Sequence, residues 1–134
     1  MKFITRNTDY ALRAVCYIAK KNRSKVTVEE LVDKLSVPRP FIRKILQSLN
    51  RNKILKSTKG QGGGFKLAIP AKKLYLIKIM NIFQGDFVLS GCFLKKDICP
   101  NKGKCLLRKK IKNIEQNVLS QLKAINIASL LGKR

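Results

Sequence analysis

Three cysteines lie close together in the chain, with six residues between Cys92 and Cys99 and five between Cys99 and Cys105. The stretch that carries them contains Gly, Pro and several Lys, so packing in an apolar core does not explain these thiols. Three thiolates favour a soft metal centre. Structural zinc takes four Cys or His ligands, often with a C-x2-C pair, and the sequence has neither that pair nor any His. The spacing therefore indicates an iron–sulfur cluster, with a thiol switch or inert thiols as alternatives.

The remaining ionisable and nucleophilic residues do not support an enzyme. Without His, the Ser-His-Asp and Cys-His nucleophile systems are excluded. The acids form no close pair in an apolar setting suited to general acid–base catalysis; they are Asp9, Glu29, Glu30, Asp33, Asp86, Asp97 and Glu115. Cys16 stands among Val15, Tyr17 and Ile18, and we interpret it as a small buried apolar residue.

The charge balance points to a polyanionic partner. The chain has 134 residues, with 30 Lys and Arg against 7 Asp and Glu, a formal net charge of +23. Nucleic acid is the commonest partner of so basic a domain. No apolar run has the length of a membrane span and no signal-peptide core is found at the N-terminus, so we expect neither membrane insertion nor secretion, and a cytoplasmic location.

The elements that must position these residues begin with three helices. The first is predicted over residues 9–21, with Thr8 or Asn7 as its cap and Asp9 in its first turn. Thr27 and Glu30 form a capping box that opens a short second helix. Pro38 and Pro40 then mark the start of a third helix, which ends near Asn50. Its predicted core positions are Phe41, Ile45 and Leu49.

Two short helices joined by a short turn are the arrangement of a helix-turn-helix. The third helix exposes donors that could contact phosphates and base edges: Arg39, Arg43, Lys44, Gln47, Ser48 and Arg51. The alternative is a solvated basic face in a protein that is basic everywhere. A hairpin follows directly, because Ile54 and Leu55 begin a strand, residues 60–64 form a turn, and Phe65, Leu67 and Ile69 alternate. This succession is that of a winged helix, and Lys56, Lys59 and Lys66 give the hairpin a basic edge.

The C-terminal half is predicted to be helical on both sides of the cysteines. A short amphipathic helix covers residues 74–83 and ends at Gly85. A long helix follows the cysteines, with an apolar stripe of Leu107, Ile111, Ile114, Val118, Leu122 and Ile125. So regular a stripe at the end of a small domain favours packing against a second copy of the chain. The alternative is a helix folded back on its own core.

Four segments resemble one family, the Rrf2 family of winged-helix transcriptional regulators, and most closely its NsrR-like members. They are Thr8-Asp9-Tyr10-Ala11-Leu12-Arg13-Ala14, residues 37–46, the wing from Gly60 to Leu67, and the three cysteines. The resemblance covers nearly the whole chain. It implies a homodimer built on the long helix, a dyad-symmetric operator in double-stranded DNA and, in cluster-binding members, a 4Fe-4S or 2Fe-2S cluster that senses nitric oxide, redox or iron status.

For the cluster, the resemblance implies Cys92, Cys99 and Cys105 as ligands. IscR-like members carry a His three residues after the last cysteine, where this chain has Arg108, which cannot ligate. NsrR-like members use an aspartate of the first helix, supplied by the other subunit, and Asp9 matches it. The alternative role of Asp9 is that of a helix cap.

For DNA, the resemblance places Lys59 where family members often have an Arg that enters the minor groove. We expect the DNA contacts from the third helix and the wing, through Arg39, Pro40, Arg43, Lys44, Gln47, Lys56, Lys59, Gly62 and Gly63. The predicted fold class is mainly α with a small β-hairpin. Residues 1–84 form the winged helix-turn-helix domain, 85–105 the cysteine-bearing sensor loop and 106–134 the dimerisation helix.

Two other functions remain open from the sequence. One is a cluster-free winged-helix regulator gated by thiol oxidation or by a partner protein, and the other is a basic RNA-binding or nucleoid-type protein without a sensor.

Overall fold

The computed structural model describes residues 3–21, 24–60, 62–89 and 105–132. Along these residues the elements follow in the order α1 (Arg6–Lys21), α2 (Val28–Leu35), α3 (Arg39–Arg51), β1 (Leu55–Thr58), β2 (Gly64–Leu67), the 3-10 turn η1 (Ala71–Lys73), α4 (Leu76–Gln84), α5 (Leu106–Lys123) and α6 (Ile127–Leu130). The predicted class, helices with one antiparallel hairpin and a long C-terminal helix, is confirmed.

Helix α1 starts earlier than the sequence pattern predicts. Its cap is Thr5, whose hydroxyl accepts the backbone N–H of Thr8 at 3.4 Å and whose carbonyl accepts that of Asp9 at 2.9 Å. The prediction of Thr8 or Asn7 as cap is wrong, because both lie inside the helix. The Thr8 side chain is instead fully buried and donates a hydrogen bond to Gln84 Oε1 at 2.7 Å.

Helices α2 and α3 form the predicted helix-turn-helix. Thr27 Oγ1 accepts the N–H of Glu30 at 3.1 Å, so the predicted cap of α2 is confirmed. Ser36 ends α2 in the left-handed conformation, with φ of 54°, and its N–H returns to the Val32 carbonyl. Because Pro38 cannot extend α2, the chain turns there and α3 begins, with Pro40 in its first turn.

The buried face of α3 differs from the predicted one. Ile42, Ile45, Leu46 and Leu49 are buried, whereas residue Phe41 is 42% exposed. Phe41 is therefore not a core residue, and the prediction is wrong at this position. The core follows the pattern of positions 42, 45, 46 and 49, and residue 41 falls on the flank of that apolar stripe.

The end of α3 leads into the wing through a Schellman motif. Ile54 N–H bonds to the Leu49 carbonyl at 3.0 Å and Lys53 N–H to that of Asn50 at 3.0 Å, and Ile54 and Leu49 are both fully buried. Lys53 occupies the left-handed position of this motif, with φ of 62°, where glycine is usual. The motif fixes the direction in which β1 leaves the helix.

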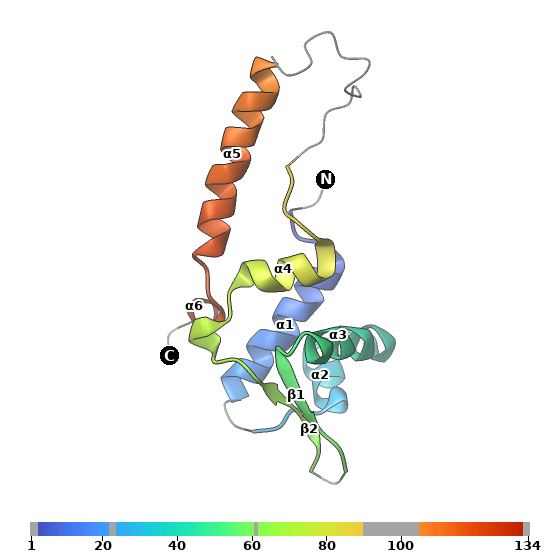
Figure 1. The fold of residues 1–134 in the computed structure, drawn as a ribbon. Coiled ribbons are helices and arrows are strands. Elements are labelled where there is room, and N and C mark those ends of the chain that lie inside the picture. Colours follow the sequence, from blue (N-terminus) through green and yellow to red (C-terminus); the bar gives the residue numbers. More distant parts are fainter. Residues whose placement is uncertain (1–2, 22–23, 61, 90–104, 133–134) are drawn as a thin grey trace.

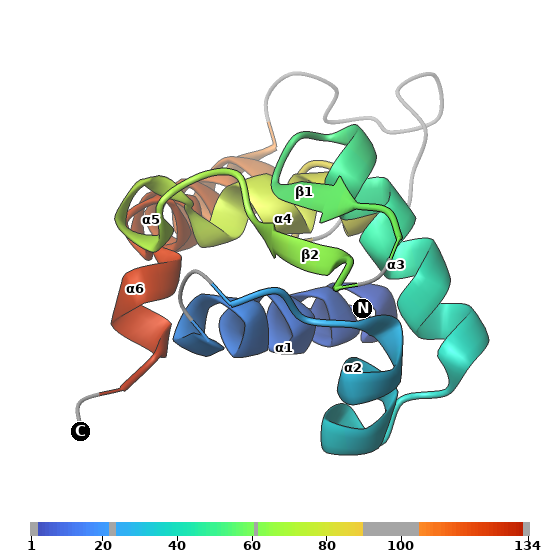
Figure 2. The ribbon, with the colours of Figure 1, turned by 90° about the horizontal axis from the view of Figure 1, so that it is seen from below.

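The wing is the antiparallel pair of β1 and β2, in which Leu55 faces Leu67 and Thr58 faces Gly64. Phe65, the second residue of β2, also forms an isolated antiparallel bridge with Val26. At the tip of the wing Gly63 N–H bonds to the Gly60 carbonyl at 2.9 Å, and a Cβ on Gly63 would lie 2.3 Å from the Thr58 carbonyl oxygen. Only glycine fits at position 63. Figure 2 shows the hairpin beside α1 and α3.

Helix α5 stands apart from the winged helix-turn-helix. Figure 1 shows it running from α6 and α4 away from the wing, with its N-terminal half clear of the other labelled elements. Its C-terminal end packs on α4 in a second apolar cluster of Leu76, Met80, Phe87 and Leu122. The predicted stripe of α5 includes Ile125, and this is wrong because α5 ends at Lys123. The Ile125 carbonyl instead accepts the N–H of Leu76 at 2.9 Å, and Ile127 returns to the main core.

Candidate functional site

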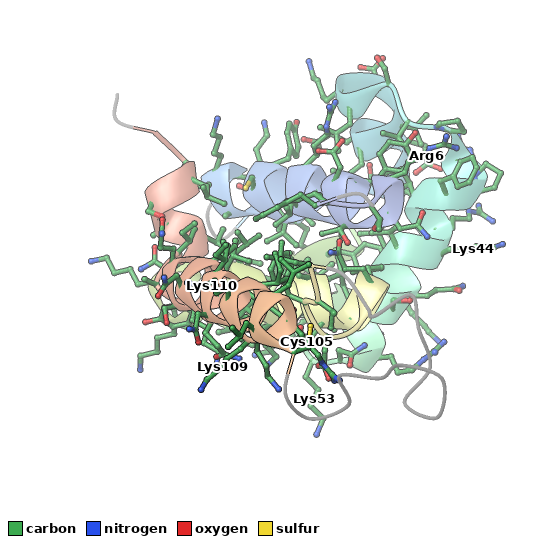
Figure 3. All side chains as sticks on the ribbon, turned by 90° about the horizontal axis from the view of Figure 1, so that it is seen from above. Arg6, Lys44, Lys53, Cys105, Lys109 and Lys110 are labelled. Atoms are coloured by element: carbon green, nitrogen blue, oxygen red, sulfur yellow. The ribbon has the colours of Figure 1, made fainter. Side chains whose placement is uncertain are left out.

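The outward face of α3 carries the residues that the sequence predicts for DNA contact. Arg39, Pro40, Arg43, Lys44 and Gln47 are all exposed and share one side of the helix, opposite the buried Ile45 and Leu49. Figure 3 shows Lys44 pointing away from the body of the molecule. Ser48, predicted to be exposed with them, is partly covered. The five exposed residues named above give α3 one continuous basic face.

One of these donors has an intramolecular partner. The guanidinium of Arg39 forms an ion pair with the carboxylate of Glu29 on α2, and both side chains are substantially exposed. The hydrogen bond from Arg39 lowers the pKa of Glu29, and the charge of Arg43 acts in the same direction. Glu29 thus stays ionised at neutral pH and competes with any phosphate for Arg39.

The wing brings like charges together. Lys56 on β1 lies directly opposite Lys66 on β2, and both are exposed. Like charges at facing positions of an antiparallel pair destabilise the pair. Lys59 is exposed at the end of β1, beside the turn that contains Gly62 and Gly63. This arrangement suits a bound polyanion, which would neutralise the repulsion.

Asp9 lies in the first turn of α1, where the positive end of the helix favours a carboxylate. Its Oδ2 is 3.1 Å from Arg13 Nε, one turn further along, and 47% of its side chain is exposed. Asp9 does not cap the helix through its side chain; that role belongs to Thr5. Its carboxylate therefore remains accessible to a further partner.

Cys105 caps α5. Its sulfur accepts the backbone N–H of Arg108 at 3.4 Å, and the residue is partly buried. A cysteine sulfur that faces the start of a helix can serve as a metal ligand. Cys92 and Cys99 lie outside the described residues. Among the residues that are described, no three His, Cys, Asp or Glu side chains gather into a metal-binding group.

Cys16 is different in kind. It lies half-buried against the main core, and burial raises the pKa of its thiol, so it stays protonated at neutral pH. This environment agrees with the interpretation of Cys16 as a packing residue.

A hydrogen-bond network that the sequence does not reveal ties α1 to the end of α4. Gln84 Oε1 accepts from Thr8 Oγ1 and from the N–H of Thr5 at 3.1 Å, while Gln84 Nε2 donates to the Phe3 carbonyl at 3.0 Å. The rings of Phe3 and Phe87 pack beside it, with centroids 5.1 Å apart. Gln84 has no distinctive sequence signal, since its partners lie 76 to 81 positions earlier.

The chain beyond α4 is also tied to α5. The N–H of Leu89, the last described residue before the cysteine-bearing segment, donates to Glu115 Oε2 at 3.0 Å. In the N-terminal half of α5, Ile114 is 50% exposed and Leu107 is 69% exposed. In the C-terminal half, Val118 packs against the second cluster. The apolar stripe is therefore divided into one part that meets the same chain and one part without a described partner.

None of the described helices is long and apolar enough to cross a membrane.

Comparison with known proteins places these features in context. A family model described as Rrf2, an iron-dependent transcriptional regulator, matches residues 4–133. An HTH-type transcriptional regulator of Aquifex aeolicus is 28% identical over 125 residues, 92% of this chain and 87% of that protein. The HTH-type transcriptional regulator NsrR of Oceanobacillus iheyensis is 28% identical over 93 residues, 69% of this chain and 63% of NsrR. Among solved structures, CymR, the global cysteine regulator of B. subtilis, shares the fold with a TM-score of 0.80 at 19% identity, over 98% of this chain and 97% of CymR.

Proposed function

The chain belongs to the Rrf2 family of DNA-binding transcriptional regulators, and from this premise we propose that it is a homodimeric repressor gated by an iron–sulfur cluster. The observation that carries the DNA-binding part is the continuous basic face of α3 beside a wing whose facing lysines repel each other. In a dimer, two such faces fit a dyad-symmetric operator. Arg39, Arg43, Lys44 and Gln47, with Pro40, enter the major groove, and Lys56 and Lys59, with Gly62 and Gly63, approach the backbone or minor groove.

The dimer is proposed to form on α5. The N-terminal half of that helix stands clear of the other labelled elements, and it carries the exposed side chains of Leu106, Leu107 and Ile114. A second α5 would remove these side chains from water. The same contact would place Cys105 of one chain and α1 of the partner chain in one assembly. A cluster ligand supplied by the other subunit requires such an assembly.

The donor set fits an iron–sulfur cluster. Cys105 presents its sulfur at the N-terminus of α5, and Asp9 keeps a half-exposed carboxylate. We propose Cys92, Cys99 and Cys105 of one chain and Asp9 of the partner as the four ligands. When bound, the cluster supplies an iron site that reacts with oxygen or nitric oxide. Carboxylate oxygen is a harder and weaker ligand to iron than thiolate, so the Asp9 position is the labile one.

The described contacts supply a path from this site to the DNA-binding face. Asp9 follows Thr8, which is fixed to Gln84 at the end of α4, and Tyr10 in the same turn packs on Phe41 of α3. A change in the ligation of Asp9 therefore acts on a helix that contacts the recognition helix directly. This coupling makes a two-state switch between high and low operator affinity.

The DNA-binding part is tested by selecting an operator from genomic DNA and measuring binding over a range of salt. Lys59→Ala is expected to weaken binding to all sequences, whereas Arg43→Ala also changes site preference and costs about 1–3 kcal/mol. Asp33→Ala, on the exposed side of α2, is the control. If both basic variants bind the operator as well as the wild type, this DNA face is wrong.

The cluster is tested by anaerobic reconstitution with iron and sulfide counting. Changing Cys92, Cys99 or Cys105 to Ala is expected to abolish the cluster, while Cys16→Ala leaves it intact. Asp9→Ala is expected to keep the fold and dimer but to lose iron faster under nitric oxide. An Asp9→Ala protein that holds iron as tightly as the wild type refutes the fourth ligand alone. A colourless wild-type protein without iron favours the alternative, a cluster-free regulator gated by thiol oxidation or a partner protein.

A further inference from the structure

Phe41 is an exposed aromatic side chain on the recognition helix. The residue is 42% exposed, while the next residue, Ile42, is fully buried. The other large apolar side chains that are exposed among the described residues lie outside the helix-turn-helix and the wing: Phe3, Tyr75, Val88, Leu106, Leu107, Ile114 and Leu130. Phe41 therefore places an apolar group at the edge of the basic face of α3.

The position of Phe41 on α3 directs its ring toward the end of the helix that enters the groove. Arg39 is the first residue of α3, so Phe41 lies in the first turn. Side chains on a helix lean toward its N-terminus. In helix-turn-helix proteins the N-terminal residues of the recognition helix are those that contact base edges.

The ring is held in place by α1. The ring of Tyr10 lies against that of Phe41, with centroids 6.1 Å apart and planes tilted by 59°. A ring supported in this way loses little conformational freedom on binding. Its neighbour Arg39 is engaged by Glu29, so the tip of α3 presents the ring and Pro40 beside a guanidinium that already has a partner.

The major groove offers one apolar group at its base edges, the C5-methyl of thymine, and Phe is among the side chains that contact it. We propose that Phe41 contacts the C5-methyl group of a thymine in each half-site of the operator. Phe41 is then a specificity-determining residue that selects thymine over cytosine at that position by apolar contact. The inference rests on the proposed DNA face of α3.

The test removes the methyl group and nothing else. An operator is first selected with the wild-type full-length protein, and each thymine is then replaced by deoxyuridine in both half-sites. At one position per half-site, deoxyuridine is expected to weaken wild-type binding about fourfold for each half-site, the factor that corresponds to one buried carbon group. Phe41→Ala is expected to bind the thymine and deoxyuridine operators equally.

Two further variants keep the comparison interpretable. Phe41→Gln retains a long side chain without the apolar ring, so it is also expected to bind the thymine and deoxyuridine operators equally. It replaces Phe41→Ala in the comparison if that variant folds poorly. Leu130→Ala removes an equally exposed apolar side chain on α6 and must leave the difference between the two operators unchanged. Thermal unfolding shows that each variant is folded.

Three results overturn the inference. If wild type binds both operators equally at every thymine, or if Phe41→Ala and Phe41→Gln keep the wild-type difference, Phe41 contacts no thymine methyl, and DNA binding through α3 still stands. If wild type selects no dyad-symmetric site, the proposed function fails and this inference fails with it.

Discussion

The phenol of Tyr17 shows how one side chain joins two helices. Its hydroxyl donates a hydrogen bond to Glu30 of α2, which also lies 3.7 Å from Lys21 Nζ on α1. Lys21 in turn lies over the Tyr17 ring, 5.5 Å from its centroid. Ionising the phenol would place a second negative charge beside the Glu30 carboxylate. The hydrogen bond to Glu30 therefore raises the pKa of Tyr17 to about 12.

This raised pKa gives a prediction about alkaline stability. In the unfolded chain the phenol ionises near pH 10. The contribution of Tyr17 to the free energy of unfolding is therefore fully present below that pH and is lost as the pH rises from about 10 to 12. A tyrosinate absorbance titration is expected to show one late-ionising phenol in the wild type. Tyr17→Phe and Glu30→Gln should both remove that late phase. Its persistence in Tyr17→Phe would assign it to another tyrosine.

The ion pair between Arg39 and Glu29 gives a second prediction at the residue scale. Glu29→Gln removes a carboxylate that competes with phosphate, so operator affinity at neutral pH is expected to rise severalfold, with stability nearly unchanged because exposed pairs contribute little. The pKa of Glu29 is lower in the folded protein than in the unfolded chain. The pair's small contribution to the free energy of unfolding is therefore present above the usual pKa range of a carboxyl group, and it is lost as the pH falls through the pKa of Glu29 in the folded state. Unchanged or weaker binding by Glu29→Gln would show that Arg39 does not meet the DNA.

At the scale of elements, the end of α3 contains a local conflict. Lys53 adopts the left-handed conformation at the position of the Schellman motif where a side chain is unfavourable. Lys53→Gly is expected to raise the free energy of unfolding by about 1 kcal/mol, measured by denaturant titration. Lys59→Gly, where φ is not positive, serves as the control and should give no gain. A loss of stability in Lys53→Gly would mean that the charge at the C-terminal end of α3 outweighs the strain.

The wing contains a conflict of charge. Replacing Lys66 by Gln removes the repulsion from Lys56, so the hairpin should gain about 0.2–1 kcal/mol. The same change removes one positive charge from the proposed DNA-binding wing, so the slope of log affinity against log salt should fall by up to about one for each wing. Calorimetry and salt-dependent binding together measure both effects. Tighter DNA binding by Lys66→Gln would place the wing away from the DNA.

The sequence predicts those parts of the elements that depend on neighbouring residues. The Thr27 cap, the proline start of α3 and the glycine turn of the wing follow from residues a few positions apart. The Thr5 cap does not, because Thr8 is drawn into a bond with the distant Gln84. The predicted stripe through Phe41 fits helical spacing as well as the observed one, and tertiary contacts decide between them. Likewise Ile125 continues the stripe of α5 but is held outside that helix by Leu76.

At the scale of the whole molecule, the uncovered part of the α5 stripe gives a prediction about assembly. Ile114→Asp places a charge where the second copy would pack, so sedimentation should show a monomer in place of a dimer. Asn113→Asp adds the same charge to the neighbouring exposed position and should remain dimeric. Val118→Asp would be a poorer probe, because Val118 packs within its own chain. A dimeric Ile114→Asp protein would move the interface away from this stripe.

The network around Gln84 has a consequence for the order in which the chain folds. Thr8 Oγ1 and Gln84 Oε1 are separated by 76 residues along the sequence. A ribosome adds roughly 5–20 residues per second, so the start of α1 waits on the order of 4–15 s for its partner. During that time Ala11, Val15 and Ile18 have no complete core to cover them. We therefore expect the apolar face of the nascent first helix to be open to chaperones that bind exposed apolar segments.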